Sequence, residues 1–438
     1  MAIANIKAYS HLTDADIEEI GRRLDAIKAD VESTLGERDV RYIKSMIRTQ
    51  RILELSGRAT LLLSHRKPAF WAGTGMLALA KILENMEIGH NVIHGQWDWM
   101  NDPTIHSTTW EWDMNCPSKQ WMHTHNHVHH TYTNILGMDH DVGYGVLRVT
   151  RDRKWAPQHA FQPVTNAVLA SFFQWAIAFY DVELGRLFAG KQTWEETAPK
   201  FWETVAKVRN QVLKDYLLYP LLTGPNFKHT VRANLIANLV RNWWSYAVIF
   251  CGHFPDEAET FTKEQWENET KGEWYLRQML GSANFKGGAA LTILSGNLNY
   301  QIEHHLFPDM PSNRLAAVGK QVQALAEEFD LPYHTGSFPA QFGKVQRTLL
   351  KLSLPNSFLA ASPDNAPEVR SNQAFTPDIE ANLQVGADEA GRRRGLKPGL
   401  QLLAKARPSA KEALRYALMR PVRRQSRVHK AEVNGTIG

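Results

Sequence analysis

The stretch HTHNHVHH, residues 123–130, holds five histidines in eight positions. Imidazole rings packed this closely resist being protonated together, and a metal ion removes the difficulty because it binds the neutral ring. Within the stretch, His125, His129 and His130 have the i, i+4 and i, i+5 spacing that brings side chains together on a helix. The stretch therefore predicts a metal site rather than an accidental cluster.

Two shorter histidine motifs lie on either side of this stretch in the chain. The segment HNVIH begins at His90 and ends at His94, a spacing that places both rings on one face of a helix. The segment QIEHHLFP begins at Gln301 and contains His304 and His305. Either motif alone is weak evidence, but three motifs separated by apolar stretches predict one shared site.

Several classes of metalloprotein do not fit the pattern. A metalloprotease would carry HExxH, which is absent. Soluble four-helix di-iron proteins need two Glu-x-x-His units, and the sequence offers one convincing unit, from Glu87 to His90. Cys116 and Cys251 are too few for a cysteine-rich zinc or iron–sulfur site. A soluble zinc protein is disfavoured because zinc takes about four ligands and more histidines are present.

Composition and charge bound the class of protein. The chain has 438 residues, of which 43% are hydrophobic and 22% charged, which excludes full disorder and collagen. The net charge of +5 conceals a basic tail at residues 391–438 and an acidic remainder. Such a tail either meets an anionic surface such as lipid headgroups or stays solvated, and nothing else favours nucleic acid. The N-terminus has no signal-peptide pattern, so we expect the protein to face the cytoplasm.

Helical patterns dominate the rest of the chain. Residues 13–35 predict a helix that Thr13 or Asp14 caps, and residues 192–220 predict an amphipathic helix. Four stretches are moderately apolar, namely 51–64, 69–86, 163–182 and 233–252. They are either buried core helices or membrane spans whose polar residues face a protein interior.

The three motifs, in this order, resemble the three histidine boxes of membrane fatty acid desaturases. The matching segments are GHNVIHG at 89–95, HNHVHHTYTN at 125–134 and NYQIEHHLFPDMP at 299–311. The Gln-x-x-His-His-Leu-Phe-Pro form is similar to that of the acyl-CoA and acyl-lipid branch, which includes linoleoyl-CoA-type enzymes. The stretch from Asn85 to Trp99 resembles bacterial members, and the whole resemblance covers roughly residues 50–340.

The resemblance implies a fold and a location. The fold would be all-α, an integral membrane four-span helical bundle with a cytoplasmic helical cap that carries a di-iron site. The protein would be multi-pass in the inner (cytoplasmic) membrane, with membrane lipids as partners and its active site facing the cytoplasm. We expect an N-terminal cytoplasmic helical region at 1–50, a desaturase domain at 51–340 and a polar, basic tail at 341–438.

The resemblance also implies a ligand set. Carried over residue by residue, the metal ligands are His90, His94, His125, His129, His130, His253, His304 and His305. His253 enters because it follows the fourth apolar stretch, and Gln301 is either a ligand or a neighbour of one. His123 and His127 are additional histidines in the second box. Acidic neighbours of the boxes are predicted to orient the imidazoles, and these are Glu87, Asp139, Asp141 and Glu303.

The implied function is an O2-dependent desaturase that inserts a cis double bond into a fatty acyl chain carried by CoA or a lipid. Two non-haem irons would be the cofactor, because breaking an unactivated C–H bond needs a strong oxidant and imidazole suits iron. The sequence has no His-Pro-Gly-Gly box of a fused cytochrome b5, no CxxC and no credible nucleotide fingerprint. We therefore expect a separate NAD(P)H-dependent reductase or ferredoxin-like electron donor. A hydroxylase or epoxygenase on the same scaffold is the alternative, and a non-catalytic metal-binding membrane protein is a more distant one.

Overall fold

The structure is a computed structural model, and it describes residues 6–139, 141–150, 153–255 and 258–355. This part of the chain is mostly helical, as predicted. The first nine α-helices are α1 (Asp14–Ser33), α2 (Glu37–Leu61), α3 (Lys67–Ile82), α4 (Asn91–Ile93), α5 (Ser118–Trp121), α6 (His130–Tyr132), α7 (Gln162–Ser171), α8 (Phe173–Tyr180) and α9 (Leu184–Phe188). The others are α10 (Trp194–Leu213), α11 (Tyr219–Leu222), α12 (Phe227–His253), α13 (Lys263–Trp266), α14 (Lys271–Leu280), α15 (Ala289–Leu294), α16 (Gln301–Leu306), α17 (Leu315–Glu328) and α18 (Phe338–Leu352).

Two short strands and three π-helical segments complete the elements that matter here. Strand β1 (Asn284–Lys286) pairs in parallel with β2 (Thr335–Ser337), with Phe285 opposite Gly336. The π-helical segments are η3 (Leu83–His90), η5 (Met122–His129) and η8 (Lys214–Leu218). Two of them contain or end at predicted metal ligands.

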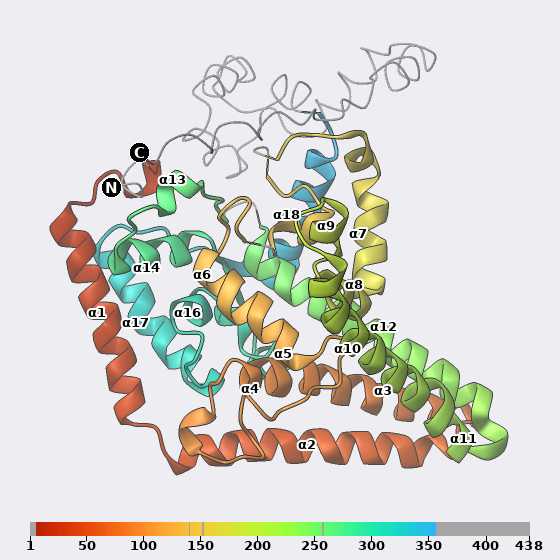
Figure 1. The fold of residues 1–438 in the computed structure, drawn as a ribbon. Helices are drawn as coiled ribbons and strands as arrows, with labels where there is room; N and C mark the ends of the chain where they lie inside the picture. Colours follow the sequence, from red (N-terminus) through yellow and green to blue (C-terminus); the bar gives the residue numbers. More distant parts are fainter. Residues whose placement is uncertain (1–5, 140, 151–152, 256–257, 356–438) are drawn as a thin grey trace, which may run out of the picture.

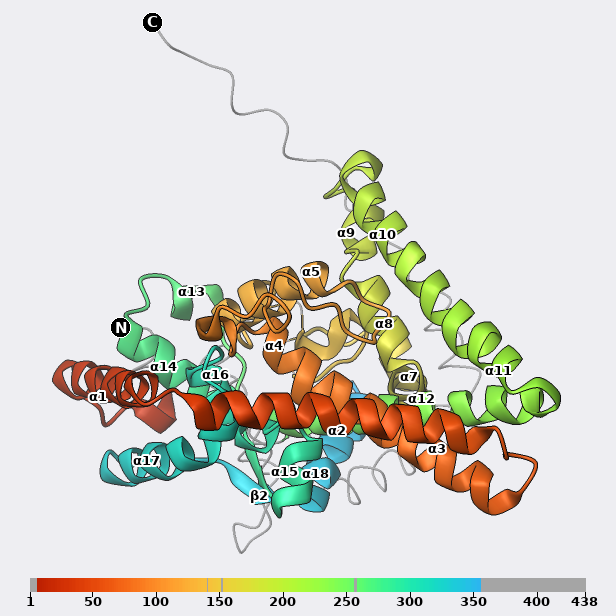
Figure 2. The same ribbon diagram turned by 90° about the horizontal axis from the view of Figure 1, so that it is seen from below.

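The helices divide into a compact body and a projecting arm. Helices α1 and α2 frame two sides of the body, α3 lies along α2, and α12 packs against α3 (Figure 1). Helices α14, α16 and α17 lie beside α1 (Figure 1). From below, α10 slants from α9, which stands out from the body, to α11, which lies beside α12 near the ends of α2 and α3 (Figure 2).

The N-terminal helix forms as the sequence predicts. Thr13 accepts a hydrogen bond from the backbone of Asp16, whose carboxylate in turn accepts one from the Thr13 backbone, so that α1 begins with a capping box. Ile17, Ile20 and Leu24 are buried on one face, where they join the hydrophobic core shared with α14, α16 and α17. The predicted helix at 13–35 is therefore confirmed as α1.

The prediction of an integral four-span membrane bundle is wrong. None of the described helices is both long enough and apolar enough to cross a bilayer. The stretch 163–182 is divided between two short helices, α7 and α8, at Phe172. The stretch 51–64 is the end of α2, which carries Arg51, Glu54 and Arg58 on successive turns.

Helix α12 is long enough to cross a bilayer but is not apolar enough, because it carries polar residues on its buried face. It is 27 residues long, but it buries Asn234, Asn238, Arg241 and Asn242. The Arg241 guanidinium donates to the Asn238 side-chain oxygen at 3.2 Å and to the side chain of Gln174. This helix is thus a core helix with a polar network, one of the two interpretations that the apolar pattern allowed. The multi-pass topology fails with the four-span bundle, while a location at the inner membrane stays a prediction.

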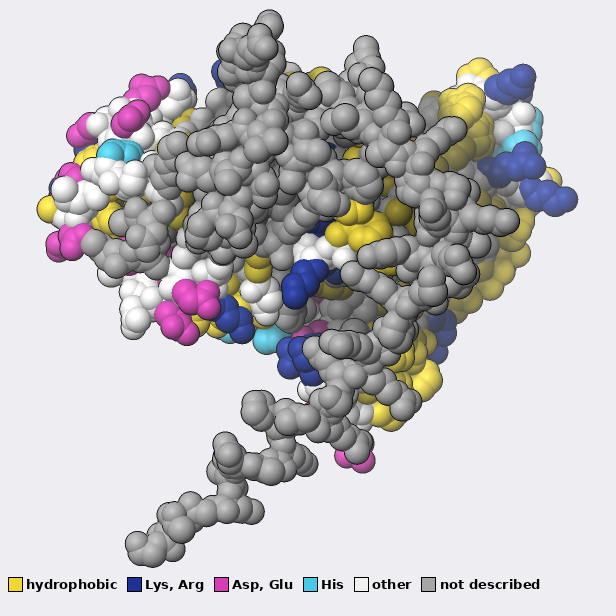
Figure 3. Space-filling view, turned by 90° about the horizontal axis from the view of Figure 1, so that it is seen from above, with side chains coloured by type: hydrophobic (Ala, Val, Ile, Leu, Met, Phe, Trp, Pro, Cys, Tyr) yellow, Lys and Arg dark blue, Asp and Glu magenta, His cyan; other side chains and the backbone are white. Residues whose placement is uncertain are grey.

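Large apolar side chains are exposed over the arm and the adjoining helices. Figure 3 shows them along the right-hand flank, the side on which α11 and α12 lie in Figure 1. The exposed side chains include Trp202, Leu213, Leu221, Leu222 and Leu239. A contiguous apolar surface of this kind marks an interaction surface rather than ordinary solvent exposure.

The predicted domain boundaries remain predictions. Helix α18 packs against α12 and α7, and the remainder of the predicted tail, from residue 356 onward, lies outside the described residues.

Candidate metal centre

The first histidine box lies on a π-helical segment and the turn that follows it. Helix α3 continues directly into η3, which ends at His90. The single turn α4 then leads to His94. A π-helix fits an extra residue into its turn and is frequent at functional sites, because it turns side chains toward a point that a regular helix would miss. The His90 and His94 rings lie 4.6 Å apart between centroids.

The other histidines come from four further elements. The π-helical η5 carries His125 and His129, and α6 begins at His130. Helix α12 ends at His253, whose neighbours Phe250 and Phe254 belong to a second hydrophobic core. Helix α16 carries His304 and His305 between Ile302 and Leu306 of the first core. The cluster thus lies where the two cores meet.

The structure brings all eight predicted ligands into one buried cluster with two parts. In the first part, one ring nitrogen from each histidine lies within 4.8 Å of the others, and its members are His90, His94, His125 and His304. The second part meets the same limit with His129, His253 and His305. The His130 ring lies between the parts, with centroids 4.7 Å from His94 and 4.4 Å from His305.

The ring nitrogens are suited to a metal because they have no other partner. Within the described chain, no hydrogen-bond partner meets the buried Nε2 atoms of His94, His125, His129, His130, His304 and His305. A buried polar atom left without a partner costs about 1–3 kcal/mol, so a metal ion that bound these atoms would remove that cost. The described residues therefore fit a metal centre.

Burial also sets the protonation that metal binding requires. Burial lowers the pKa of His90 to about 4. Burial, with the neighbouring imidazoles, lowers the pKa of His94 and His304 well below the usual value. The same holds for the pKa of His125, His130, His253 and His305. Neutral rings at physiological pH are the form that binds metal.

His129 is the exception, and its carboxylate neighbours explain why. Burial lowers its pKa, but the charges of Asp139 and Asp141 outweigh burial and raise the pKa above its usual value. Its Nδ1 atom lies 3.0 Å from both carboxylate oxygens of Asp139. The Asp139 carboxylate therefore orients this ring and leaves Nε2 directed at the cluster.

Other rings are held by comparable contacts. His125 Nδ1 lies 3.1 Å from the Asp141 carboxylate, so both aspartates contact an imidazole of the cluster as predicted. Glu87 and Glu303 instead accept hydrogen bonds from side chains other than histidine, so this part of the prediction is wrong. Neutral side chains donate hydrogen bonds to both carboxylates in place of histidine. Tyr42 is one of the donors to Glu87.

Three supporting residues are absent from the sequence prediction. Gln278 and Thr133 approach His305 Nδ1 at 3.1 Å and 3.3 Å. Trp121 stacks on the His125 ring, with centroids 4.3 Å apart. Trp121 lies four residues before His125, so helical spacing could have predicted this contact. No sequence pattern links Gln278 to His305, which is 27 positions away.

The structure also shows where His123, His127 and Gln301 lie, whose roles the sequence left open. His123 and His127 are exposed and lie beside each other, 5.9 Å apart between ring centroids, so His125, His129 and His130 are the members of this box that enter the cluster. The side-chain nitrogen of Gln301 lies 3.0 Å from His253 Nε2. This close approach needs glycine at 252, because a Cβ there would lie 2.7 Å from the Gln301 side chain.

A small cavity of about 30 Å³ adjoins the cluster. Its polar lining includes His90, His125 and Asp181, and Ile177 and Leu298 are among its apolar residues. Asp181 accepts hydrogen bonds from Cys116 Sγ at 2.7 Å and Thr124 Oγ1 at 2.9 Å. The cavity therefore offers a reacting group an apolar wall close to the predicted ligands.

Comparison with known proteins agrees with this site. The family model for fatty acid desaturases matches residues 67–337. The chain is 54% identical over 421 residues to the NADPH-dependent stearoyl-CoA 9-desaturase of Mycobacterium tuberculosis, covering 94% of this chain and 97% of that one. It is also 26% identical over 278 residues to the sn-1 linoleoyl-lipid 6-desaturase of Synechocystis, covering 61% and 75% of the two chains.

The predicted family and enzyme class are confirmed by these comparisons. The family model covers the three histidine motifs, and the mycobacterial relative matches nearly the whole chain. The chain therefore belongs to the fatty acid desaturase family and is an oxidoreductase that acts on fatty acyl chains.

Proposed function

We propose that the histidine cluster binds two non-haem iron ions. One would be held by His90, His94, His125 and His304, and the other by His129, His253 and His305. His130 lies between them and completes the set. The observation that carries the proposal is the group of buried Nε2 atoms that lack any other partner within the described chain. Imidazole suits iron, and neutral ligands leave the centre cationic.

When bound, the irons would supply the oxidising power by which O2 removes two hydrogens from neighbouring acyl carbons, leaving a cis double bond and water. The protein's own residues do the positioning. Asp139 and Asp141 fix the rings of His129 and His125. The apolar side chains of Ile177 and Leu298 line the cavity beside them and limit the access of water.

We propose a saturated long-chain acyl-CoA as the substrate, with the new double bond at carbon 9. Support comes from the mycobacterial relative, a stearoyl-CoA 9-desaturase that matches nearly the whole chain. Lipid-linked acyl chains are the second candidate, because the Synechocystis relative is described as acting on a lipid. A separate NADPH-dependent reductase would supply the electrons, as the dependence of the mycobacterial relative suggests.

A test of the substrate uses purified full-length protein loaded with iron. It would be incubated with NADPH, a bacterial reductase, O2 and either stearoyl-CoA or a stearoyl phospholipid. Mass spectrometry of derivatised products would locate the double bond. We expect a 9-monounsaturated product from the CoA ester, and none from Asp139→Asn at matched protein concentration if iron is lost. A product from the phospholipid alone would contradict the proposed carrier.

The same experiment separates the proposal from its nearest rival. A hydroxylase or epoxygenase on this scaffold would use the same ligands, so ligand geometry does not distinguish it. A hydroxy or epoxy acid as the main product would replace desaturation by oxygen insertion. Product mass decides between them, because desaturation removes two hydrogens and the rival reactions add oxygen.

A further inference from the structure

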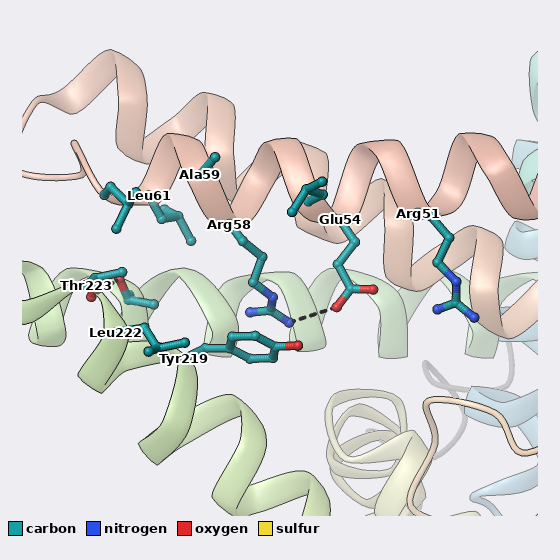
Figure 4. Close-up of a pocket in the computed structure, with 11 residues that line it drawn as sticks. Arg51, Glu54, Arg58, Ala59, Leu61, Tyr219, Leu222 and Thr223 are labelled. Carbon is teal, nitrogen blue, oxygen red and sulfur yellow. Dashed lines mark hydrogen bonds and ion pairs between the residues drawn. The ribbon is translucent and has the colours of Figure 1, made fainter.

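A groove far from the histidine cluster lies between α2, α11 and α12. It has a volume of about 590 Å³ and is predominantly apolar, with Leu55, Leu62 and Leu222 among its lining residues. Figure 4 shows it as a channel beneath α2, with Tyr219 and Leu222 on the opposite side. None of its lining residues lines the cavity beside the cluster.

One end of the groove is charged. Arg51, Glu54 and Arg58 project from the same face of α2 toward α11 and α12 (Figure 4). The Arg58 guanidinium lies 3.4 Å from the centroid of the Tyr219 ring and donates to Glu54 at 3.2 Å. In the described chain, Arg51 has no carboxylate within ion-pair distance. The groove therefore joins an apolar channel to a free cation.

The surrounding charges leave this end positive. The cations in and behind it are Arg51, Arg58, Lys81, Lys214 and Arg241, and their carboxylate partners are Glu54, Asp113 and Asp215. Burial raises the pKa of the remaining carboxyl, Glu84, to about 8, so that it is mostly neutral at pH 7. Among the residues that line the groove, Arg51 and Arg58 carry positive charge and Glu54 carries negative charge, which leaves one net positive charge that favours an anion there.

We propose that this groove binds a long-chain fatty carboxylate. The carboxylate would lie at Arg51, beside the Arg58 guanidinium. The hydrocarbon chain would follow Leu55, Leu62 and Leu222 along α2. The distance along α2 from residue 51 to residue 62 is about 16 Å at the helical rise of 1.5 Å per residue, which covers most of the length of an extended long chain. The inference does not rest on the proposed desaturase activity, because the groove and the histidine cluster share no residue.

The test is photo-crosslinking of the full-length protein. The probe is stearic acid with a diazirine near its methyl end, and its methyl ester is the neutral comparison. We expect the acid to label peptides containing residues 51–62 or 219–223, and the ester to label them far less. Equal labelling by acid and ester, or labelling of other peptides only, would overturn the proposal.

Variants at exposed positions keep the test independent of folding. Arg51→Gln removes the free cation and should lower labelling of the groove about fivefold, the size of a partly exposed charge contact. Leu222→Trp should abolish labelling by filling the groove, and Leu222 is 67% exposed, so the core is untouched. Arg48→Gln on the same helix is the matched control and should change nothing. Unchanged labelling of Arg51→Gln or Leu222→Trp would contradict the proposed site.

Discussion

At the residue scale, a single carboxylate sets the geometry of His129. Asp139 contacts His129 Nδ1 with both oxygens and also accepts from the backbone N–H groups of Asn134 and Asp141. Its position is therefore fixed before any metal binds. Carboxylates in this position typically raise metal affinity by 10- to 100-fold.

We expect Asp139→Asn to lower iron affinity by about 10- to 100-fold. Asparagine keeps the shape of the side chain but not the charge that holds the imidazole. The measurement is iron binding to purified protein by competition with a chelator. Asp330→Asn, at an exposed loop position, is the matched control. Equal iron affinity of wild type and Asp139→Asn would show that the carboxylate does not support the site.

Glu84 provides a prediction of pH dependence. It is buried, one of its oxygens has no hydrogen-bond partner in the described chain, and burial raises its pKa from 4.5 to about 8. The unfolded chain loses this proton at lower pH than the folded chain does. The stability contributed by the proton therefore falls as pH rises from about 4.5 through about 8.

Glu84→Gln should remove this dependence. Relative to the wild type, the variant should gain about 2–3 kcal/mol in free energy of unfolding between pH 6 and pH 9. Thermal melts of metal-free protein at the two pH values measure the gain. Glu18→Gln, on the exposed face of α1, should show no such gain. A constant difference between Glu84→Gln and wild type at both pH values would mean that Glu84 is ionised in the fold.

Residue identity predicted the cluster better than it predicted what surrounds it. Eight histidines follow from their spacing and from the family resemblance, and they do come together. Gln278 and Thr133 were beyond prediction because they reach His305 through tertiary packing, which leaves no local pattern. The predicted contacts of Glu87 and Glu303 with histidine rings are wrong, because a residue that is next to a histidine in sequence need not point its side chain toward the ring.

At the element scale, the π-helical segments orient the histidine side chains of the first two boxes. The i, i+4 spacing predicted a regular helix through His90, but the preceding turns are π-helical. The same is true of η5, which carries His125 and His129. Residue spacing alone does not reveal a π-helix, because its extra residue depends on packing against neighbouring elements.

Deleting Asn85 from η3 tests this geometry. Loss of one residue lets the segment return to a regular helix and moves His90 from the position that the π-helical turns give it. We expect iron binding to be lost while circular dichroism still reports a helical protein. Deletion of Gly190, whose neighbourhood is open, is the control and should retain iron. Normal iron content after deletion of Asn85 would contradict the role of the π-helix.

The sequence predicted correctly those helices whose first turns are set by local capping residues. Capping boxes begin α1 at Thr13 and α10 at Thr193, and both helices were predicted. The stretch 163–182 looked continuous because its apolar residues run through Phe172, where the helix is interrupted between α7 and α8. Hydropathy records composition but not such a break.

At the scale of the whole molecule, a buried ion network joins segments distant in sequence. Lys81 of α3 lies 2.9 Å from Asp113 and 2.9 Å from Asp215 of η8. Burial lowers the pKa of Lys81, but both carboxylates outweigh burial and raise it. The apolar pattern of α3 did not predict that Lys81 contacts Asp113 and Asp215, because each aspartate comes from another part of the chain.

Lys81→Met should lower the free energy of unfolding by about 3–5 kcal/mol, because it removes the cation that bridges two carboxylates and leaves buried Asp215 with the more distant Arg58, at 3.6 Å. The double variant Lys81→Met with Asp215→Asn should recover part of the loss. Chemical denaturation of the three proteins measures both effects. A single variant as stable as the wild type would show that the network contributes little.

Eight histidines from four regions of the chain are proposed to hold two irons. The most direct test is the metal content of full-length protein expressed with iron, together with Mössbauer spectra of wild type, His304→Ala and His253→Ala. We predict two nitrogen-ligated irons per wild-type chain and reduced iron in each variant, because each histidine belongs to a different part of the cluster. Wild-type protein that holds a single iron, or zinc in place of iron, would contradict the account.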